Sequence, residues 1–182
     1  RLVGSEMCIR DSDEIGNTLI SIGRQYGVDF ESQIENRLLI QNGAFSSSVG
    51  LFDGNTPLNQ KGTGSQRLLS MGLNVQASDG SALLVIDEVE SGLEPYRLRS
   101  LLSELRISHV SCGQVIMTTH SPIAVAECTI DELLIVHSRN GQTDIFSPKS
   151  GSPEVDTAMQ AQIRKNAEAF LCRRLIVCEG KT

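Results

Sequence analysis

The chain has 182 residues and a formal net charge of −6, and 40% of its residues are hydrophobic and 21% charged. Its length is enough for a real hydrophobic core, its composition is that of a soluble globular protein, and its acidic balance argues against a broadly basic, DNA-coating surface while leaving room for a local basic groove. No apolar run approaches the roughly 18 residues of a membrane-spanning helix, and no secretory signal is visible. The five cysteines include no C-x-x-C pair, which favours reduced thiols. We therefore expect a cytoplasmic protein without a membrane partner.

The first part of the chain predicts two helices separated by short strands. Residues 1–12 fit no periodic pattern, and 7–12 resemble translated sequencing adapter, so we expect a non-native segment and a true beginning upstream. Residues 13–27 have loose helical spacing. Strands at 37–40 and 49–52, a loop at 56–63 and a helix at 66–73 follow, with turns at Asn42-Gly43 and Asp53-Gly54 and with Leu68, Leu69 and Leu73 on the apolar side of the helix.

The middle of the chain predicts a βαβ unit. The apolar run 83–86 is typical of a strand buried on both faces, and it ends in Asp87 and Glu88. Pro95 begins a helix, and a second buried strand at 114–118 follows, so the two strands are expected to be parallel. The helix has its apolar stripe at Leu98, Leu101, Leu102, Leu105 and Ile107.

The last part of the chain predicts a hairpin, a linker and a further strand. A short helix follows Pro122, and strands at 133–137 and 143–146 bracket the turn 139–141. Residues 147–156 are rich in Ser, Gly and Pro and predict a linker. A helix at 157–173, with Ile163, Ala167, Phe170 and Leu171 directed inward, then leads to a third buried strand at 175–178.

Three stretches carry chemistry, and each also has a plainer explanation. Residues 61–67 place glycines and hydroxyls before a helix, which suits an anion but also describes a flexible capped loop. Asp87 and Glu88 lie where a parallel sheet binds ligands, although four apolar residues before two acids are common. His120 follows the next strand, so it can lie beside both acids, although a lone histidine is usually structural. Asp87 is suited to hold Mg²⁺ and Glu88 to polarise an attacking water.

The ordered set resembles the C-terminal half of an ABC-class ATPase head over roughly residues 37–137. Gly62, Thr63, Gly64, Ser65 and Gln66 resemble the signature motif, with Thr63 where the family usually has Ser, and residues 83–88 resemble Walker B. Residues 91–94 resemble the D-loop, with Glu94 where transporters commonly have Asp, and His120 resembles the switch histidine. The resemblance implies ATP and Mg²⁺ as cofactors, held between the heads of a homodimer, with residues 62–66 contacting the partner's nucleotide.

Residues 89–95 and 173–180 make the chain similar to the OLD (overcoming lysogenization defect) family of ATP-dependent endonucleases. The stretch 173–180 resembles the opening strand of a TOPRIM domain, which implies that Glu179 binds a metal ion or acts in acid–base chemistry. A plainer interpretation is an ordinary strand with a polar end. The resemblance to this family implies DNA as a partner of the full-length protein.

The chain has no Walker A motif, because G-x-x-x-x-G-K-[ST] ending at Thr182 requires glycine where Leu175 stands. We therefore expect this fragment alone to be inactive, since Walker A supplies the phosphate cradle.

Together these observations predict an incomplete α/β, P-loop-NTPase-like (ABC-type) fold with a mostly parallel sheet flanked by helices. The predicted segments are 1–12, non-native; 13–147, the C-terminal part of the ATPase domain; 148–156, a linker; and 157–182, a linking helix with the start of a TOPRIM-like domain. The main functional hypothesis is a fragment of an OLD-like, ATP-dependent DNA endonuclease.

Three alternatives stay open. One is a RecF-like or chromosome-maintenance ATPase that acts in DNA repair without a nuclease, and a downstream Asp-x-Asp would separate it from the main hypothesis. Another is a non-enzymatic interaction module with a degenerate ATPase fold, which absence of an upstream P-loop would favour. A transporter subunit is the least favoured, since Val89-Glu90 replaces the usual Pro-Thr after Asp87-Glu88.

Overall fold

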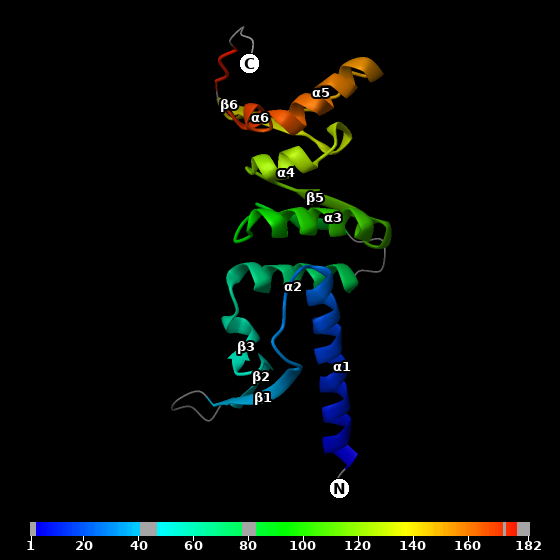
Figure 1. Ribbon diagram of the computed structural model, residues 1–182, viewed down its shortest axis with the longest axis vertical. Coiled ribbons are helices and arrows are strands. Elements are labelled where there is room, and N and C mark those ends of the chain that lie inside the picture. The colour runs from blue at the N-terminus through cyan, green and yellow to red at the C-terminus, as the bar shows by residue number, and fades with distance from the viewer. Residues whose placement is uncertain (1–2, 41–46, 78–82, 173, 178–182) are drawn as a thin grey trace. The chain divides into compact units, whose positions relative to one another are not determined.

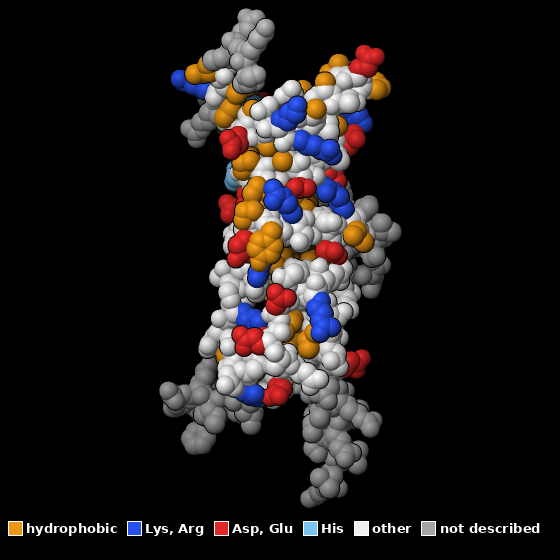
Figure 2. Space-filling model, in the orientation of Figure 1, with side chains coloured by type: hydrophobic (Ala, Val, Ile, Leu, Met, Phe, Trp, Pro, Cys, Tyr) orange, Lys and Arg blue, Asp and Glu red, His pale blue; other side chains and the backbone are white. Residues whose placement is uncertain are grey.

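The computed structural model describes residues 3–40, 47–77, 83–172 and 174–177. The chain divides into two compact units. Unit 1 comprises Arg1–Ile86 and Ser91–Ile116, and unit 2 comprises Asp87–Glu90 and Met117–Thr182. Figure 1 shows the elements of each, and Figure 2 shows basic and acidic side chains interspersed over the viewed face of the described residues.

Unit 1 begins with a long helix against an antiparallel sheet. The helix α1 spans Val3–Gln25, so it includes most of the segment 1–12 in which no periodic pattern was found. The strand β1 (Ile34–Ile40) pairs with β2 (Ser47–Asp53), which pairs with β3 (Thr56–Pro57), and both pairings are antiparallel. The 3-10 helix η1 (Leu58–Gln60) follows, so the loop expected at 56–63 is wrong for its first half. The turn at Gly54 is confirmed, whereas Asn42-Gly43 lies outside the described residues.

The helix α2 (Thr63–Gln76) confirms the helix predicted at 66–73 and extends it in both directions. It packs against α1 and against α3 (Pro95–Cys112). A Cβ atom on Gly72 would lie 2.2 Å from Ile22 Cγ2 and 3.0 Å from the Tyr26 ring, so glycine allows α1 and α2 to approach. The buried apolar side chains of unit 1 include Leu19, Ile22, Tyr26, Val28, Ile34, Leu68, Leu69, Met71, Ile86, Leu98, Leu101, Leu102 and Leu105.

The predicted burial of several apolar side chains in unit 1 is wrong. In β4 (Leu83–Ile86) only Ile86 is buried, while Val85 is 66% exposed. In β5 (Gln114–Met117) Ile116 is exposed. These two strands are hydrogen-bonded neighbours in a two-stranded sheet, and an apolar run predicts a strand without showing that layers cover both of its faces. Leu73 and Ile107 are also exposed, and helical spacing places Ile107 on the side of α3 opposite Leu98, outside the buried stripe.

In unit 2 one helix packs against two shorter helices. The helix α4 (Pro122–Glu127) and the 3-10 helix η2 (Ile130–Glu132) both contact α5 (Pro153–Lys165). Because α5 starts at Pro153, the last part of the linker expected at 148–156 is helical. Asp156, in the first turn of α5, accepts hydrogen bonds from the backbone N–H (2.7 Å) and the hydroxyl (2.8 Å) of Ser150. The core consists of the buried residues Val125, Ile130, Ile163 and Ala167 with the partly buried Ala126, Leu133, Met159 and Phe170.

The hairpin of unit 2 is confirmed. The strands β6 (Ile135–Arg139) and β7 (Gln142–Phe146) are antiparallel, and the turn residues Asn140 and Gly141 have φ values of 50° and 79°. Positive φ at both positions is the geometry for which Asn-Gly is preferred.

The end of unit 2 differs from two predictions. The expected helix 157–173 is interrupted at Asn166, and α6 (Glu168–Leu171) follows as a separate short helix whose Leu171 is exposed. Leu175, Ile176 and Val177 form no strand and are exposed, so the expected buried strand is wrong over these residues. Their apolar character does not by itself supply a neighbouring strand.

Candidate functional site

In unit 1 the N-terminus of α2 is formed by the glycine- and hydroxyl-rich stretch. Gly62 has extended backbone angles, φ −54° and ψ 145°, and Thr63, Gly64 and Ser65 form the first turn. The backbone N–H groups of a first helical turn point along the axis and attract anions. Gln66 turns back, and its Nε2 donates to the carbonyls of Asn59 (2.9 Å) and Lys61 (2.7 Å), which ties the helix to the preceding segment.

The start of α2 touches the segment that precedes α3. A Cβ atom on Gly64 would lie 2.3 Å from the carbonyl oxygen of Gly92, a distance that real Cβ atoms do not adopt. Gly92 itself has φ +73°, and a Cβ atom there would lie 3.2 Å from the Thr63 hydroxyl. The signature-like and D-loop-like segments therefore meet backbone to backbone, and both glycines are required for that approach.

Arg97, on α3, connects these two segments by its side chain. Its Nη1 donates to the Ser65 hydroxyl at 3.0 Å, and its Nε lies 3.3 Å from the Glu94 carboxylate. The same Nε donates to the Tyr96 hydroxyl at 2.9 Å. The hydrogen bond with Tyr96, aided by the charge of Glu94, raises the pKa of Arg97 despite its partial burial, so this guanidinium stays charged.

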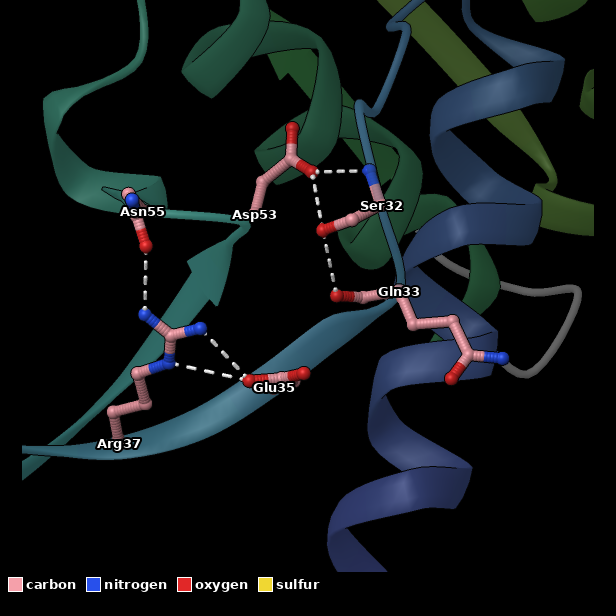
Figure 3. Close-up of polar contacts among 6 residues, drawn as sticks. All are labelled: Ser32, Gln33, Glu35, Arg37, Asp53 and Asn55. Carbon is pink, nitrogen blue, oxygen red and sulfur yellow. Dashed lines mark hydrogen bonds and ion pairs between the residues drawn. The ribbon is translucent and has the colours of Figure 1, made fainter.

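Lys61, directly before Gly62, is held by a buried carboxylate. Asp53 is 1% exposed, and its Oδ2 lies 2.7 Å from Lys61 Nζ. Its two oxygens also accept the backbone N–H groups of Glu31 (3.1 Å) and Ser32 (2.9 Å), part of which Figure 3 shows. Burial raises the pKa of Asp53, but Lys61 and the two N–H groups outweigh burial, so the pKa lies below its ordinary value.

In unit 2 one threonine holds both acids that follow β4. Thr118 Oγ1 donates to Asp87 Oδ1 at 2.6 Å and accepts the backbone N–H of Glu88 at 2.8 Å. The carbonyl of Thr118 accepts the N–H of Val89 at 3.0 Å. Glu88 has φ +46°, which is uncommon for a residue with a side chain and is maintained here by these two backbone attachments.

Glu90 fixes the backbone of His120 to the same loop. Its two carboxylate oxygens accept the Thr119 hydroxyl and the His120 backbone N–H, both at 2.6 Å. Burial raises the pKa of Glu90, but these two hydrogen bonds outweigh it, so the pKa lies below its ordinary value and Glu90 stays ionised near neutral pH. The loop that holds Glu88 and the loop that holds His120 are therefore attached at two points.

The residues predicted from the sequence form one group in each unit. Within unit 1, Gly62, Thr63, Gly64, Ser65 and Gln66 form the start of α2, and Glu94 reaches Ser65 through Arg97. Within unit 2, Asp87, Glu88 and His120 lie on two hydrogen-bonded loops. Glu179 lies outside the described residues.

Sequence reasoning missed Lys61 with Asp53, Arg97, Thr118 and Glu90. The hydroxyl pair before His120 was a usable signal, since a strand end with two threonines beside two acids favours hydrogen bonding. Over the described residues, no group of three or more His, Cys, Asp or Glu side chains could hold a metal ion. Mg²⁺ is often held by only one or two carboxylates together with substrate phosphates, so the prediction that Asp87 holds Mg²⁺ does not require such a group.

Comparison with known proteins gives one family match. The model of a family described as "AAA domain, putative AbiEii toxin, Type IV TA system" matches residues 19–126. The comparison with curated proteins found no match.

Two solved structures resemble this one. One, from a study of ATP-driven dimerization and DNA-stimulated activation of SMC ATPases, has a TM-score of 0.52 and 14% identity and covers 88% of this chain and 98% of its own. The other, an SmcHead bound to the C-winged helix domain of ScpA, has a TM-score of 0.53 and 15% identity, and the match covers 83% of this chain and 45% of that one. The fold is thus α/β and P-loop-NTPase-like, as the sequence predicts, and its sheets are mixed, with antiparallel pairing in β1–β2–β3 and in β6–β7. None of the described helices is long and apolar enough to cross a membrane.

Proposed function

The chain belongs to the AAA domain family whose description reads putative AbiEii toxin, Type IV TA system, and we propose that it forms part of an ATPase head that closes on ATP as a homodimer and reopens on hydrolysis. In this proposal Asp87 holds Mg²⁺, Glu88 polarises the attacking water and His120 contacts the γ-phosphate. The start of α2 contacts the nucleotide of the partner head. The protein acts in the cytoplasm.

The observation that carries the proposal is the attachment of Asp87 and Glu88 to Thr118. The short bond to Oδ1 orients the Asp87 carboxylate, and the bond to the Glu88 N–H fixes the backbone of the proposed base. Phosphoryl transfer depends mainly on positioning and on electrostatic stabilisation, so rigid attachment of these two acids is the feature such a site needs.

The start of α2 supports the second half of the site. Its first turn combines exposed helix N–H groups, two hydroxyls and the adjacent guanidinium of Arg97, all of which favour an anion. Hydrolysis additionally requires a phosphate cradle, which these 182 residues lack as a sequence motif. The proposal therefore concerns an intact protein in which a P-loop accompanies this chain.

For the reaction coupled to ATP hydrolysis, we propose an OLD-like DNA endonuclease in which Glu179 belongs to a TOPRIM metal site. This proposal is supported by the resemblance of residues 173–180 to the opening strand of a TOPRIM domain. The second candidate is a DNA-stimulated ATPase without nuclease activity, and the similarity of the fold to SMC ATPase structures favours it.

One experiment tests the ATPase and separates the two candidates. Purified intact protein is mixed with plasmid DNA, ATP and Mg²⁺ or Mn²⁺, and phosphate release and strand cleavage are followed together. Hydrolysis with cleavage that Glu179→Gln abolishes supports the endonuclease, whereas hydrolysis that DNA stimulates without cleavage supports the second candidate. Neither hydrolysis nor cleavage would refute the proposed ATPase.

A further inference from the structure

The D-loop-like segment of unit 1 reaches the signature-like turn through one partly buried side chain. Arg97 is 19% exposed, and it bridges the Glu94 carboxylate and the Ser65 hydroxyl, which lie on different elements. Nη1 donates to Ser65, whereas Nε donates its single hydrogen to the Tyr96 hydroxyl and lies 3.3 Å from Glu94 in an ion pair. Because the guanidinium is rigid and planar, these contacts fix the positions of Ser65 and Glu94 relative to each other.

The direction of the Arg97–Ser65 hydrogen bond matters for an anion at the helix start. Because a guanidinium can only donate, Ser65 Oγ is the acceptor in this bond. The proton of the hydroxyl can then be donated to a phosphate oxygen, and a donor that itself accepts from a cation is polarised toward stronger donation. Arg97 also brings a permanent positive charge to the first turn of α2, where the helix already favours anions.

Glu94 makes this arrangement dependent on the D-loop-like segment. It is the residue that departs from the aspartate common in transporters, and its longer side chain reaches Arg97 three positions later. Movement of the backbone around Gly92, which contacts Gly64 directly, would change the space available to the start of α2.

We infer that Arg97 is a positioning residue that orients the Ser65 hydroxyl toward the partner head's nucleotide and couples that hydroxyl to the D-loop-like segment through Glu94. The inference rests on the proposed ATP-dependent head dimer. In this inference Arg97 acts in binding the nucleotide across the dimer. Loss of the Arg97 side chain therefore weakens ATP affinity and dimer formation more than it slows the hydrolytic step.

The first test compares Arg97→Met and Arg97→Lys in the intact protein, with Arg24→Met, an exposed residue of α1, as the matched control. Loss of one hydrogen bond from a charged donor corresponds to about a tenfold change. We expect Arg97→Met to raise the KM for ATP about tenfold with less than a threefold change in kcat. Arg97→Lys keeps the charge without the fork, and we expect an intermediate KM. An unchanged KM in Arg97→Met would overturn the inference.

The second test asks whether Arg97 is the connection. Ser65→Ala and Glu94→Gln are combined in a double-mutant cycle on kcat/KM, once with Arg97 present and once with Arg97→Met. We expect the double variant to differ from the product of the single effects by at least about threefold with Arg97 present, and to match it with methionine. Multiplicative single effects with Arg97 present, or coupling that persists with methionine, would each overturn the inference.

Urea unfolding of the same variants of the 182-residue chain separates this inference from the proposed function. Coupling of Ser65 and Glu94 in unfolding without coupling in kcat/KM would make Arg97 a structural residue only, which contradicts the inference but leaves the ATPase intact. Absence of ATP hydrolysis and ATP-dependent dimers in the unmodified intact protein would refute the proposed function, and the inference would fall with it.

Discussion

Replacing Asp53 by Asn tests whether a buried ion pair anchors the segment that leads into α2. Asp53 is 1% exposed and accepts from Lys61 Nζ and from two backbone N–H groups. Asparagine has the same shape but no charge, and its amide nitrogen cannot accept the bonds that one carboxylate oxygen now accepts. Lys61, whose side chain is 16% exposed, is then left without its counter-charge.

The expected cost follows from the burial of the pair. Removing one partner of a buried ion pair typically costs about 3–5 kcal/mol, because the remaining charge is uncompensated. Lys61 keeps a hydrogen bond to the carbonyl of Asp29 at 3.0 Å and lies 4.9 Å from the Phe30 ring, which favours the lower end of that range. We therefore expect Asp53→Asn to lower the free energy of unfolding of unit 1 by about 3 kcal/mol.

The assay is urea unfolding followed by tyrosine fluorescence. The chain has no tryptophan, and both of its tyrosines, Tyr26 and Tyr96, belong to unit 1, so the signal reports that unit. The matched control is Glu35→Gln on the neighbouring strand. The Glu35–Arg37 pair is 2.9 Å long but exposed (Figure 3), so its loss should cost less than about 1 kcal/mol.

A double variant and the pH dependence sharpen this prediction. Asp53→Asn with Lys61→Met removes both charges, so the double variant should lose at least about 2 kcal/mol less than the sum of the single losses. The folded pKa of Asp53 is below the ordinary value of 3.8, so its stabilisation is present above that pH and is lost as the pH falls through the lower folded value. A loss below about 1 kcal/mol, or additive single effects, would refute the anchoring role.

Three further predictions concern single contacts. Thr118→Val in the intact protein should lower ATP turnover at least about tenfold, because Asp87 and the Glu88 N–H both lose their hydrogen bond to the Thr118 hydroxyl. Thr118→Ser keeps a hydroxyl and should retain most of the turnover. Equal rates in the threonine and valine proteins would contradict the attachment. Gly64→Ala should destabilise unit 1 by about 1–3 kcal/mol in urea, whereas Gly62→Ala, whose Cβ would meet nothing within 4 Å, should cost less, and similar losses would disprove the close approach to Gly92. Ile163 is 0% exposed, so Ile163→Ala should lower the free energy of unfolding of unit 2 by about 2–5 kcal/mol. Val155 is 49% exposed, and Val155→Ala should lower it by less than about 1 kcal/mol. Urea unfolding followed by far-ultraviolet circular dichroism measures both losses.

Local patterns in the sequence predicted the elements well where short-range chemistry decides them. The spacing of Leu98, Leu101, Leu102 and Leu105 predicted the buried side of α3, and Asn140-Gly141 predicted the hairpin turn, because helical period and positive φ are local properties. Val85 and Ile176 were predicted to be buried and are exposed, since burial depends on which other layers are present.

The candidate site was predicted as separate motifs without the contacts that join them. The acids at 87 and 88 and the histidine at 120 were identified from their order, whereas Thr118 and Glu90 were not. A hydrogen bond between residues about 30 positions apart leaves no periodic signal. The same is true of Asp53 with Lys61 and of Arg97 with Ser65, which depend on how β2, α2 and α3 pack within unit 1.

Sedimentation velocity of the intact Glu88→Gln protein tests most directly whether ATP closes a dimer of heads. The substitution removes the proposed base and leaves Asp87 and Thr118 in place, so ATP with Mg²⁺ should convert monomers to a long-lived dimer while turnover nearly stops. Adding Ser65→Arg, which places a bulky side chain at the start of α2, should abolish the dimer. Unchanged turnover in Glu88→Gln, or the same sedimentation coefficient with and without ATP, would contradict the proposed mechanism.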